Sequence, residues 1–321
     1  MIDRRRFLAV MGGSLLPSPR RAGAQPAKLV YRVGVIADKA GYEALKAGLR
    51  DVGYAEGRDM VLEFRAIDSG DVRFLDVATE LARIPVDVIV AGTTPAILAA
   101  KQATTAIPIV GLSVDPVASR LVASLAKPGG NITGLSLDEV GTNATRLELL
   151  KEAAPAVTRV AVLTTSTNPS SSQMLKETER AAQTLGVEVH AFELRGGDDL
   201  AKTFAAMTTR RVDSLIVLPS AVASSRRTQI VILALRHRLP SMFWRREFVD
   251  LGGLLSYGPD RSEIYRRAAV LVGKILQGAK PGDLPVGQPR KFDLIVNLRT
   301  AKALGLTIPS SVLLLAAEVI E

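Results

Sequence analysis

The sequence predicts an α/β protein made of two doubly wound parallel-sheet lobes, joined by a hinge of three crossovers. Three observations predict this fold class. Short continuous runs of Val, Ile and Leu are typical of strands buried on both faces, as in parallel sheets. These runs alternate with amphipathic stretches, which is typical of strand–helix–strand units. The alternation occurs in two successive, similar series, and 321 residues suit two lobes of about 120–150 residues each.

The first series occupies residues 30–112. Its expected strands are Val30–Ile36, Met60–Arg65, Val86–Ala91 and Ile107–Leu112. Its expected helices are Glu43–Val52, Val72–Arg83 and Ala96–Thr104. Because crossovers between parallel strands are right-handed, these elements are expected to form one sheet with helices on both faces.

The alternation breaks at Lys127-Pro128-Gly129-Gly130-Asn131, and a second series follows. Its expected helices are Asn143–Ala153, Ser171–Leu185, Asp199–Thr208 and Ser225–His237. Its expected strands are Arg159–Thr164, Val187–Leu194, Asp213–Leu218 and Pro240–Phe243. The two series share a weak repeat, because Val86-Asp87-Val88-Ile89-Val90 matches Val212-Asp213-Ser214-Leu215-Ile216. Two similar lobes of this kind would enclose a cleft.

The C-terminal part adds a strand at 252–259, a helix at Asp260–Gln277 and a strand at Phe292–Asn297. If the chain recrosses near Ser256-Tyr257 and again near Lys280–Leu284, three segments link the lobes and form a hinge that can close around a ligand. The expected N-terminal lobe contains residues 29–133 and 256–280, and the C-terminal lobe contains residues 134–255 and 281–321.

The first 24 residues have the pattern of an export signal. Arg4-Arg5-Arg6 precede an apolar run from Phe7 to Leu16, and Ala22-Gly23-Ala24 supplies small residues for cleavage. The beginning Arg4-Arg5-Arg6-Phe7-Leu8 resembles a twin-arginine signal, with an ordinary secretory signal as the alternative. We therefore expect an exported, periplasmic protein.

The composition excludes several classes of protein. The chain has no Cys and only two His, His190 and His237, so disulfides, thiolate metal sites and Cys nucleophiles are excluded and a His-rich metal site is not expected. Without residues 1–24, which contain five Arg and one Asp, the net charge falls from +9 to +5. The remaining charge is scattered, as on solvated helix faces, whereas a nucleic-acid-binding protein would show a basic stripe. No apolar run reaches the roughly 20 residues of a membrane span.

Catalysis and cofactor binding have little support in the sequence. No strand is followed by Gly-x-Gly-x-x-Gly, and neither Gly-x-x-x-x-Gly-Lys-Ser/Thr nor Gly-x-Ser-x-Gly occurs. His190 lies inside an expected strand, and His237 lies at a helix end between two Arg residues. We therefore expect no catalytic residue, no metal and no cofactor.

Candidate ligand-binding residues follow the expected strands, because ligands of open α/β sheets bind beyond the carboxyl ends of the strands. Thr94 suits an N-cap and Pro95 the first helical turn, where exposed N–H groups and hydroxyls would attract a carboxylate. Asp115 could accept a hydrogen bond from a ligand ammonium or hydroxyl. For each of these positions the alternative is a structural role, in capping or in packing. The full set is Asp38, Tyr42, Gly92, Thr93, Thr94, Ser113, Asp115, Asn168, Pro219, Ser220, Trp244 and Tyr257, in which the three aromatic residues could stack on a flat ligand.

Phrases along the whole chain after the leader resemble one family. They include residues 47–58 (AGLRDVGYAEGR), 121–134 (LVASLAKPGGNITG), 252–258 (GGLLSYG) and 300–309 (TAKALGLTIP). The chain resembles the ABC-transporter substrate-binding protein family that includes tryptophan/tyrosine transport binding proteins. This resemblance implies a type I periplasmic-binding fold, export and delivery of a small solute to a membrane permease. It also implies ligand contacts near Gly92–Pro95, Asp115, Asn168 and Pro219-Ser220.

Three departures from the family pattern lie at the expected cleft. The loop Gly92-Thr93-Thr94-Pro95-Ala96 is one Thr longer than the common Gly-Thr-Pro-Ala. Thr164-Thr165-Ser166 stands where relatives often carry an aromatic residue or Asn, and Trp244 stands where a small residue is common. The solute of relatives therefore does not transfer directly to this chain.

Our hypothesis from the sequence is a monomeric protein that binds a solute and does not transform it. Gly92–Pro95 would hold the solute's carboxylate, Asp115 its donor group, and the facing lobe would close over it. An aromatic amino acid or aromatic carboxylate is the first expectation for the solute, and a branched aliphatic acid or small amide is the alternative. The rival functions are an exported enzyme that uses the same cleft and a periplasmic ligand-sensing partner of a receptor.

Overall fold

The computed structural model describes residues 30–67, 73–113, 115–137, 141–166, 168, 170–195 and 200–321. The expected export signal at residues 1–24 lies outside this part of the chain. Within the described residues, no helix has both the length and the apolar character that crossing a membrane requires.

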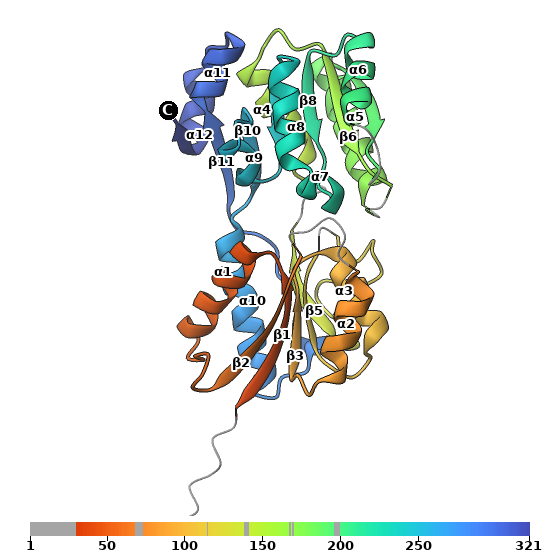
Figure 1. Ribbon diagram of the computed structural model, residues 1–321, viewed down its shortest axis with the longest axis vertical. Coiled ribbons are helices and arrows are strands. Elements are labelled where there is room, and N and C mark those ends of the chain that lie inside the picture. The colour runs from red at the N-terminus through yellow and green to blue at the C-terminus, as the bar shows by residue number, and fades with distance from the viewer. Residues whose placement is uncertain are drawn as a thin grey trace, which may run out of the picture.

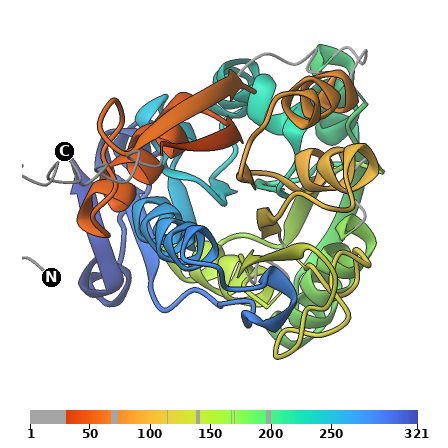
Figure 2. The same cartoon turned by 90° about the horizontal axis from the view of Figure 1, so that it is seen from below.

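The first sheet has five parallel strands in the order β2-β1-β3-β4-β5. The strands are β1 (Tyr31–Ala37), β2 (Met60–Ala66), β3 (Val88–Ala91), β4 (Ile109–Ser113) and β5 (Ile132–Ser136). One face is covered by α1 (Lys39–Asp51) and α10 (Arg261–Leu276), the other by α2 (Phe74–Arg83) and α3 (Thr94–Ala103) (Figures 1 and 2). The sheet is therefore doubly wound, as its Val- and Ile-rich strands predicted.

The second sheet has seven strands in the order β12-β11-β10-β9-β8-β6-β7. Only the β10–β11 pair is antiparallel. The strands are β6 (Arg159–Thr164), β7 (Glu188–Glu193), β8 (Ser214–Val217), β9 (Ser241–Phe243), β10 (Leu255–Pro259), β11 (Phe292–Asn297) and β12 (Ala316–Ile320). The fold class expected from the sequence is thus confirmed, with one antiparallel pair added at the end of the chain.

Helices also cover both faces of the second sheet (Figure 1). The helices on one face are α4 (Asn143–Ala153), α5 (Ser171–Leu185), α11 (Leu298–Leu304) and α12 (Ser310–Leu315), and those packed on the other are α6 (Leu200–Thr209), α8 (Arg227–Arg236) and α9 (Arg246–Asp250). The helix expected at 225–237 is confirmed as α8, with slightly shorter bounds, and the short α7 (Ala221–Ser225) that precedes it was not expected. The two helices meet at Arg226, whose φ and ψ are not helical.

The chain changes lobe three times, a few residues later than we expected. β5 belongs to the first sheet, so the first change follows Ser136. β10 pairs with β9 and β11 as far as Pro259, so residues 256–259 belong to the second sheet. The segment 281–287 still lies against the first lobe, because Thr133 Oγ1 donates to Leu284 O at 2.7 Å and Gly287 bridges Leu135.

The sequence repeat has a structural counterpart at the start of the central strands. Asp87, just before β3, accepts a hydrogen bond from Arg32 N of β1 at 2.6 Å. Asp213, just before β8, accepts from Thr158 N at 2.8 Å, Thr158 Oγ1 at 2.8 Å and Arg159 N of β6 at 3.0 Å. In both lobes a carboxylate thus joins the starts of two neighbouring parallel strands.

We expect Asp213→Ala to lower the free energy of unfolding by about 1–3 kcal/mol, because three hydrogen-bond donors lose a charged acceptor. Asp87→Ala removes one such bond and should cost less. Urea denaturation of the two variants measures the difference. Equal losses of unfolding free energy in the two variants would show that the number of hydrogen bonds accepted does not determine how much such a carboxylate stabilises the fold.

Candidate functional site

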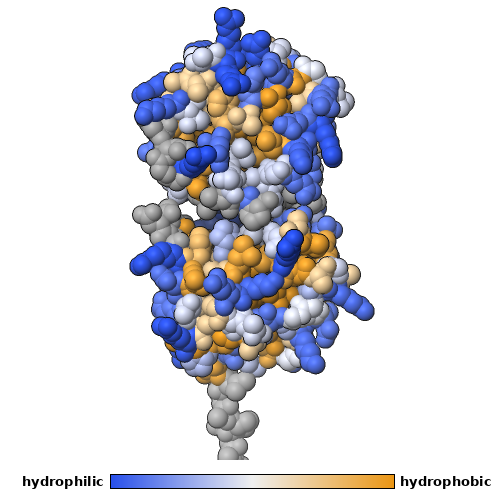
Figure 3. Space-filling model, turned by 90° about the vertical axis from the view of Figure 1, so that its right-hand side faces the viewer, coloured by the Kyte–Doolittle hydropathy of each residue, from blue (hydrophilic) through white to orange (hydrophobic). Residues whose placement is uncertain are grey.

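The two lobes face each other across the carboxyl ends of their parallel strands. The space-filling view from the side of α3 shows the surface hollowed between them (Figure 3). The loops that follow β3, β4, β6, β8 and β9 all reach this boundary, so the fold brings the predicted strand-end residues to the same region.

The predicted residues of the first lobe make local contacts. Thr93, and not Thr94 as we expected, is the N-cap of α3, and its side chain accepts from Ala96 N at 3.4 Å. Thr94 is buried, and its hydroxyl bonds the Ser113 hydroxyl at 3.1 Å, which ties the start of α3 to the end of β4. Asp115 accepts from the N–H groups of Val117 and Ala118 at 3.1 and 2.8 Å. The capping alternative therefore describes Thr93 and Asp115 in this structure.

The predicted residues of the second lobe also bond to one another. Asn168 donates from Nδ2 to Pro219 O at 2.8 Å and accepts at Oδ1 from Ser170 N at 3.0 Å. Ser220 caps α7 by accepting from Ala223 N at 3.0 Å. These contacts hold the loops after β6 and β8 together on the cleft side of the lobe.

The structure does not bring the three predicted aromatic residues together. Tyr42 stacks on Phe64 of β2 with ring centroids 4.3 Å apart, and Tyr257 stacks on Phe292 of β11 at 5.6 Å. Each ring thus packs against the core of its own lobe. Trp244, which follows β9, is buried against Phe248 but also lines the space between the lobes.

Asp38 has a role that its position in the sequence did not reveal. Its Oδ1 caps α1 through Gly41 N at 2.7 Å, while its Oδ2 accepts from Arg245 Nη2 at 2.8 Å and from Arg261 Nη2 at 2.5 Å. Arg245 lies between β9 and α9 in the second lobe, and Arg261 begins α10 at the second crossover. The carboxylate therefore forms an ion pair across the lobe boundary. We refer to Asp38, Arg245, Arg261 and Tyr265 as the hinge wall.

Charge and burial act in opposite directions on Asp38. Its burial raises the pKa. The nearby guanidiniums of Arg261 and Arg245 and the hydrogen bond from Gly41 N lower it by more, so the net pKa lies below the ordinary value for Asp. Asp38 is therefore ionised at neutral pH, with both of its oxygens engaged.

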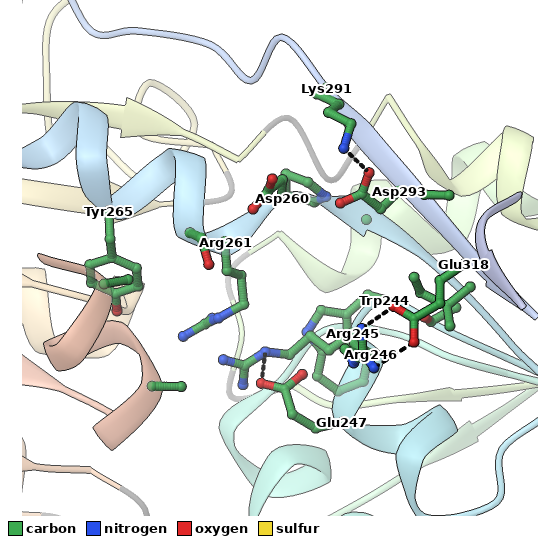
Figure 4. A pocket seen from close by; sticks show the side chains of 18 of the residues that line it. Trp244, Arg245, Arg246, Glu247, Asp260, Arg261, Tyr265, Lys291, Asp293 and Glu318 are labelled. Carbon is green, nitrogen blue, oxygen red and sulfur yellow. Dashed lines mark hydrogen bonds and ion pairs between the residues drawn. The ribbon is translucent and has the colours of Figure 1, made fainter. Parts of the chain in front are cut away.

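Two cavities meet at the hinge wall. The larger, about 480 Å³, opens on the side of α1 and β12 and contains charged side chains from both lobes and the hinge, among them Arg246, Asp260, Lys291 and Glu318 (Figure 4). The smaller, about 20 Å³, lies on the side of the predicted loop and is lined by Gly92, Leu112 and Leu137. The residues that line both cavities are Trp244, Arg245, Pro259, Arg261 and Tyr265.

Tyr265 of α10 fills a space that two glycines leave open. It is 1% exposed, and a Cβ added at Gly92 or at Gly41 would lie 2.4 or 2.5 Å from its hydroxyl oxygen. Burial raises the pKa of Tyr265 above the ordinary value, so its hydroxyl keeps its proton. Gly92 was predicted as a ligand contact, and in the structure its missing side chain makes room for this hydroxyl.

Sequence reasoning missed Arg245, Arg261 and Tyr265. Arg245-Arg246 was interpreted as part of the solvated charge, and Tyr265 lies within a stretch that predicts an ordinary helix. A signal was present in Gly41 and Gly92, since a glycine beside a buried strand end can indicate the close approach of another group. Within the described residues, no group of three or more His, Cys, Asp or Glu is arranged to hold a metal ion.

Two doubly wound lobes that face each other across a three-segment hinge define a solute-binding protein of the type I periplasmic-binding class. The chain belongs to the ABC transporter substrate binding protein family, whose sequence profile matches residues 35–320. The resemblance found in the sequence is thereby confirmed.

Individual relatives support the same assignment. The chain is 28% identical over 270 residues to a tyrosine-binding protein of Clostridioides difficile (strain R20291), an alignment that covers 84% of this chain and 77% of the relative. Its structure is similar to an ABC domain of Streptococcus pneumoniae in complex with L-Trp, with a TM-score of 0.80, 26% identity and coverage of 90% of this chain and 99% of that one. A conserved domain protein of Vibrio cholerae gives a TM-score of 0.81 at 26% identity, with coverage of 91% of this chain and 100% of that one.

The ion pair at Asp38 predicts a pH-dependent contribution to stability. Because the pKa is lowered in the folded state, the contribution should be fully present above the unfolded pKa of about 3.9 and be lost as the pH falls through the folded value. At pH 7 we expect Asp38→Asn to lower the free energy of unfolding by about 1–3 kcal/mol, because both guanidiniums lose a partly buried anion. Urea denaturation between pH 7 and pH 3 measures this difference.

The matched control is Asp51→Asn, at the exposed end of α1, which should change little. A difference between wild type and Asp38→Asn that stays constant down to pH 3 would contradict an origin in the charge of Asp38.

The fit between Gly92 and Tyr265 predicts a selective rescue. Gly92→Ala should destabilise the protein by about 1–3 kcal/mol, since its Cβ would overlap the Tyr265 hydroxyl. Tyr265→Phe removes that oxygen and should restore stability in the double variant. Gly41→Ala should not be rescued, because its Cβ would also lie 2.3 and 2.6 Å from Cζ and Cε2 of the same ring. A double-mutant cycle by urea denaturation tests both statements. Equal rescue of the two glycine variants would exclude the hydroxyl as the specific obstacle.

Proposed function

We propose that this protein is the extracytoplasmic solute-binding component of an ABC importer. It would hold a small carboxylate-bearing solute between its lobes and present the closed form to permease subunits in the membrane. The observation that carries the proposal is the pair of lobes whose strand ends face each other, joined through three segments and the ion pairs of Asp38 with Arg245 and Arg261. Such a hinge allows closure around a ligand.

The class of solute is proposed from two features. Proteins similar to this chain are named for tyrosine binding and described in complex with L-Trp. Trp244 lines both spaces between the lobes and can pack against an aromatic ring. An aromatic amino acid or an aromatic carboxylic acid is therefore the proposed solute.

The remaining parts of the proposal rest on sequence and family. The leader pattern of residues 1–24 supports export to the periplasm, and the family supports transport without chemical change of the solute. A monomer suits a protein that must dock on a permease with both lobes. The rival function is an exported enzyme that uses the same interlobe space.

The proposal predicts ligand-dependent stabilisation of residues 25–321. A solute that binds only the folded protein adds about 2.7 kcal/mol at a concentration of 100 Kd, which raises Tm by about 5 °C. Thermal-shift assays with L-tryptophan, L-tyrosine, 4-hydroxybenzoate, L-leucine and glucose would measure this, followed by recovery of the ligand.

We expect a shift with one or more of the aromatic acids, no shift with glucose, and recovery of the ligand unchanged. No shift with any carboxylate would reject the proposed class of solute. Recovery of a converted compound would support the enzyme instead.

A further inference from the structure

We infer that the hydroxyl of Tyr265 and the guanidinium of Arg245 bind the carboxylate of the solute. This inference rests on the proposed function and adds two ligand-binding residues to it. It also places the carboxylate at the hinge wall, whereas the sequence had suggested the start of α3.

The Tyr265 hydroxyl is a buried donor without an acceptor. Its oxygen has no hydrogen-bond partner among the described residues, although the side chain is 1% exposed. A buried hydroxyl without a partner costs free energy, and such groups are rare in folded proteins. The hydroxyl lies beside Gly92 and Gly41, and the Arg261 guanidinium lies over its ring at 5.5 Å from the centroid. A ligand oxygen that accepts from this hydroxyl would complete the site.

Arg245 supplies a second incomplete donor. Its Nη2 donates to Asp38, but its Nε is buried and makes no hydrogen bond with a described residue. The nearest other carboxylate is Glu247, whose Oε1 lies 3.8 Å from this Nε, beyond hydrogen-bond distance. A guanidinium usually binds a carboxylate with two parallel N–H groups, so Arg245 retains the capacity for a further anion.

Asp38 does not bond these donors. Its Oδ1 accepts from Gly41 N, and its Oδ2 already accepts from both Arg245 and Arg261. One carboxylate therefore serves two guanidiniums, and the phenol beside them has no acceptor. A negatively charged acceptor suits this surplus of donors better than a neutral amide does, because hydrogen bonds to charged groups are stronger.

The space beside the hinge wall suits a small molecule. Arg245 and Tyr265 both line the larger cavity, whose volume of about 480 Å³ lies in the usual range for small-molecule sites. The same cavity is lined by Trp244 and by the carboxylates of Asp260 and of Asp293, the latter paired with Lys291 (Figure 4). A solute with its carboxylate at the hinge wall could place a ring near Trp244 and an ammonium near these acids.

Tyr265→Phe is the sharpest test, because it removes an atom that has no partner in the described structure. We expect stability in urea equal to or above that of wild type, because no hydrogen bond is lost. By isothermal titration calorimetry we expect affinity about 10-fold or more lower for the carboxylates that bind wild type among L-tryptophan, L-tyrosine and 4-hydroxybenzoate. Arg245→Gln should weaken the same ligands by about 10- to 100-fold. L-Tryptophanamide should bind wild type more weakly than L-tryptophan does, and both substitutions should affect it less.

Two matched controls test whether the loss of affinity is specific to the proposed site or follows from any Tyr→Phe or Arg→Gln substitution. Tyr54→Phe alters a tyrosine that lines neither cavity and packs edge-on against Tyr31, and it should leave affinity unchanged. Arg159→Gln alters an arginine at the start of β6 that lines neither cavity, is 43% exposed and pairs with Glu188, and it should also leave affinity unchanged.

Three outcomes would overturn the inference. Equal affinity of wild type and Tyr265→Phe for a bound carboxylate would show that the hydroxyl does not contact the ligand. Equal losses for L-tryptophan and its amide would exclude the carboxylate as the group recognised. If wild type binds none of the carboxylates, the proposed class of solute fails together with the inference, whereas binding that both variants retain removes the inference alone.

Discussion

The orientation of the two lobes relative to each other depends on the ion pair of Asp38 with Arg245 and Arg261. Each of the four apolar clusters of the described residues lies within a single lobe. A change in the angle between the lobes therefore disrupts no core packing. It must, however, stretch or break a partly buried ion pair, whose partners are 17–28% exposed. The hinge thus combines three connecting segments of the chain with the directional ion pair of Asp38. This combination suits a protein whose lobes move as rigid bodies.

Two glycines make this arrangement possible. Gly41 lies in the first turn of α1, three residues after the capping Asp38, and Gly92 directly follows β3. The ring and hydroxyl of Tyr265 can therefore reach the strand ends of the first lobe. The hydroxyl is thereby held next to the ion pair without a partner of its own. Donors gathered in this way, with their acceptor absent, are what a preorganised anion site requires before its ligand arrives.

The sequence predicted the fold well because buried parallel strands have a strong signal. Strands such as Val88–Ala91 and Ser214–Val217 are buried throughout, and the Asp that precedes each one also marks the repeat. β5 was missed because Ile-Thr-Gly-Leu-Ser is short and contains Gly134, at φ +151, where the backbone of Gly111 approaches closely. Site residues were harder to predict. Caps and ligand contacts use the same residue types, and the partners of Asp38 lie 207 and 223 residues away in sequence.

The most direct test of this account is a crystal structure of residues 25–321 with the aromatic acid that binds most tightly. The account predicts that the ligand carboxylate lies within about 3 Å of both the Tyr265 hydroxyl and an Arg245 nitrogen, the usual hydrogen-bond distance. It also predicts that the ring lies near Trp244. A carboxylate bound at Thr93 and Thr94, with the Tyr265 hydroxyl still unpaired, would contradict the hinge wall as the binding site and return the site to the start of α3.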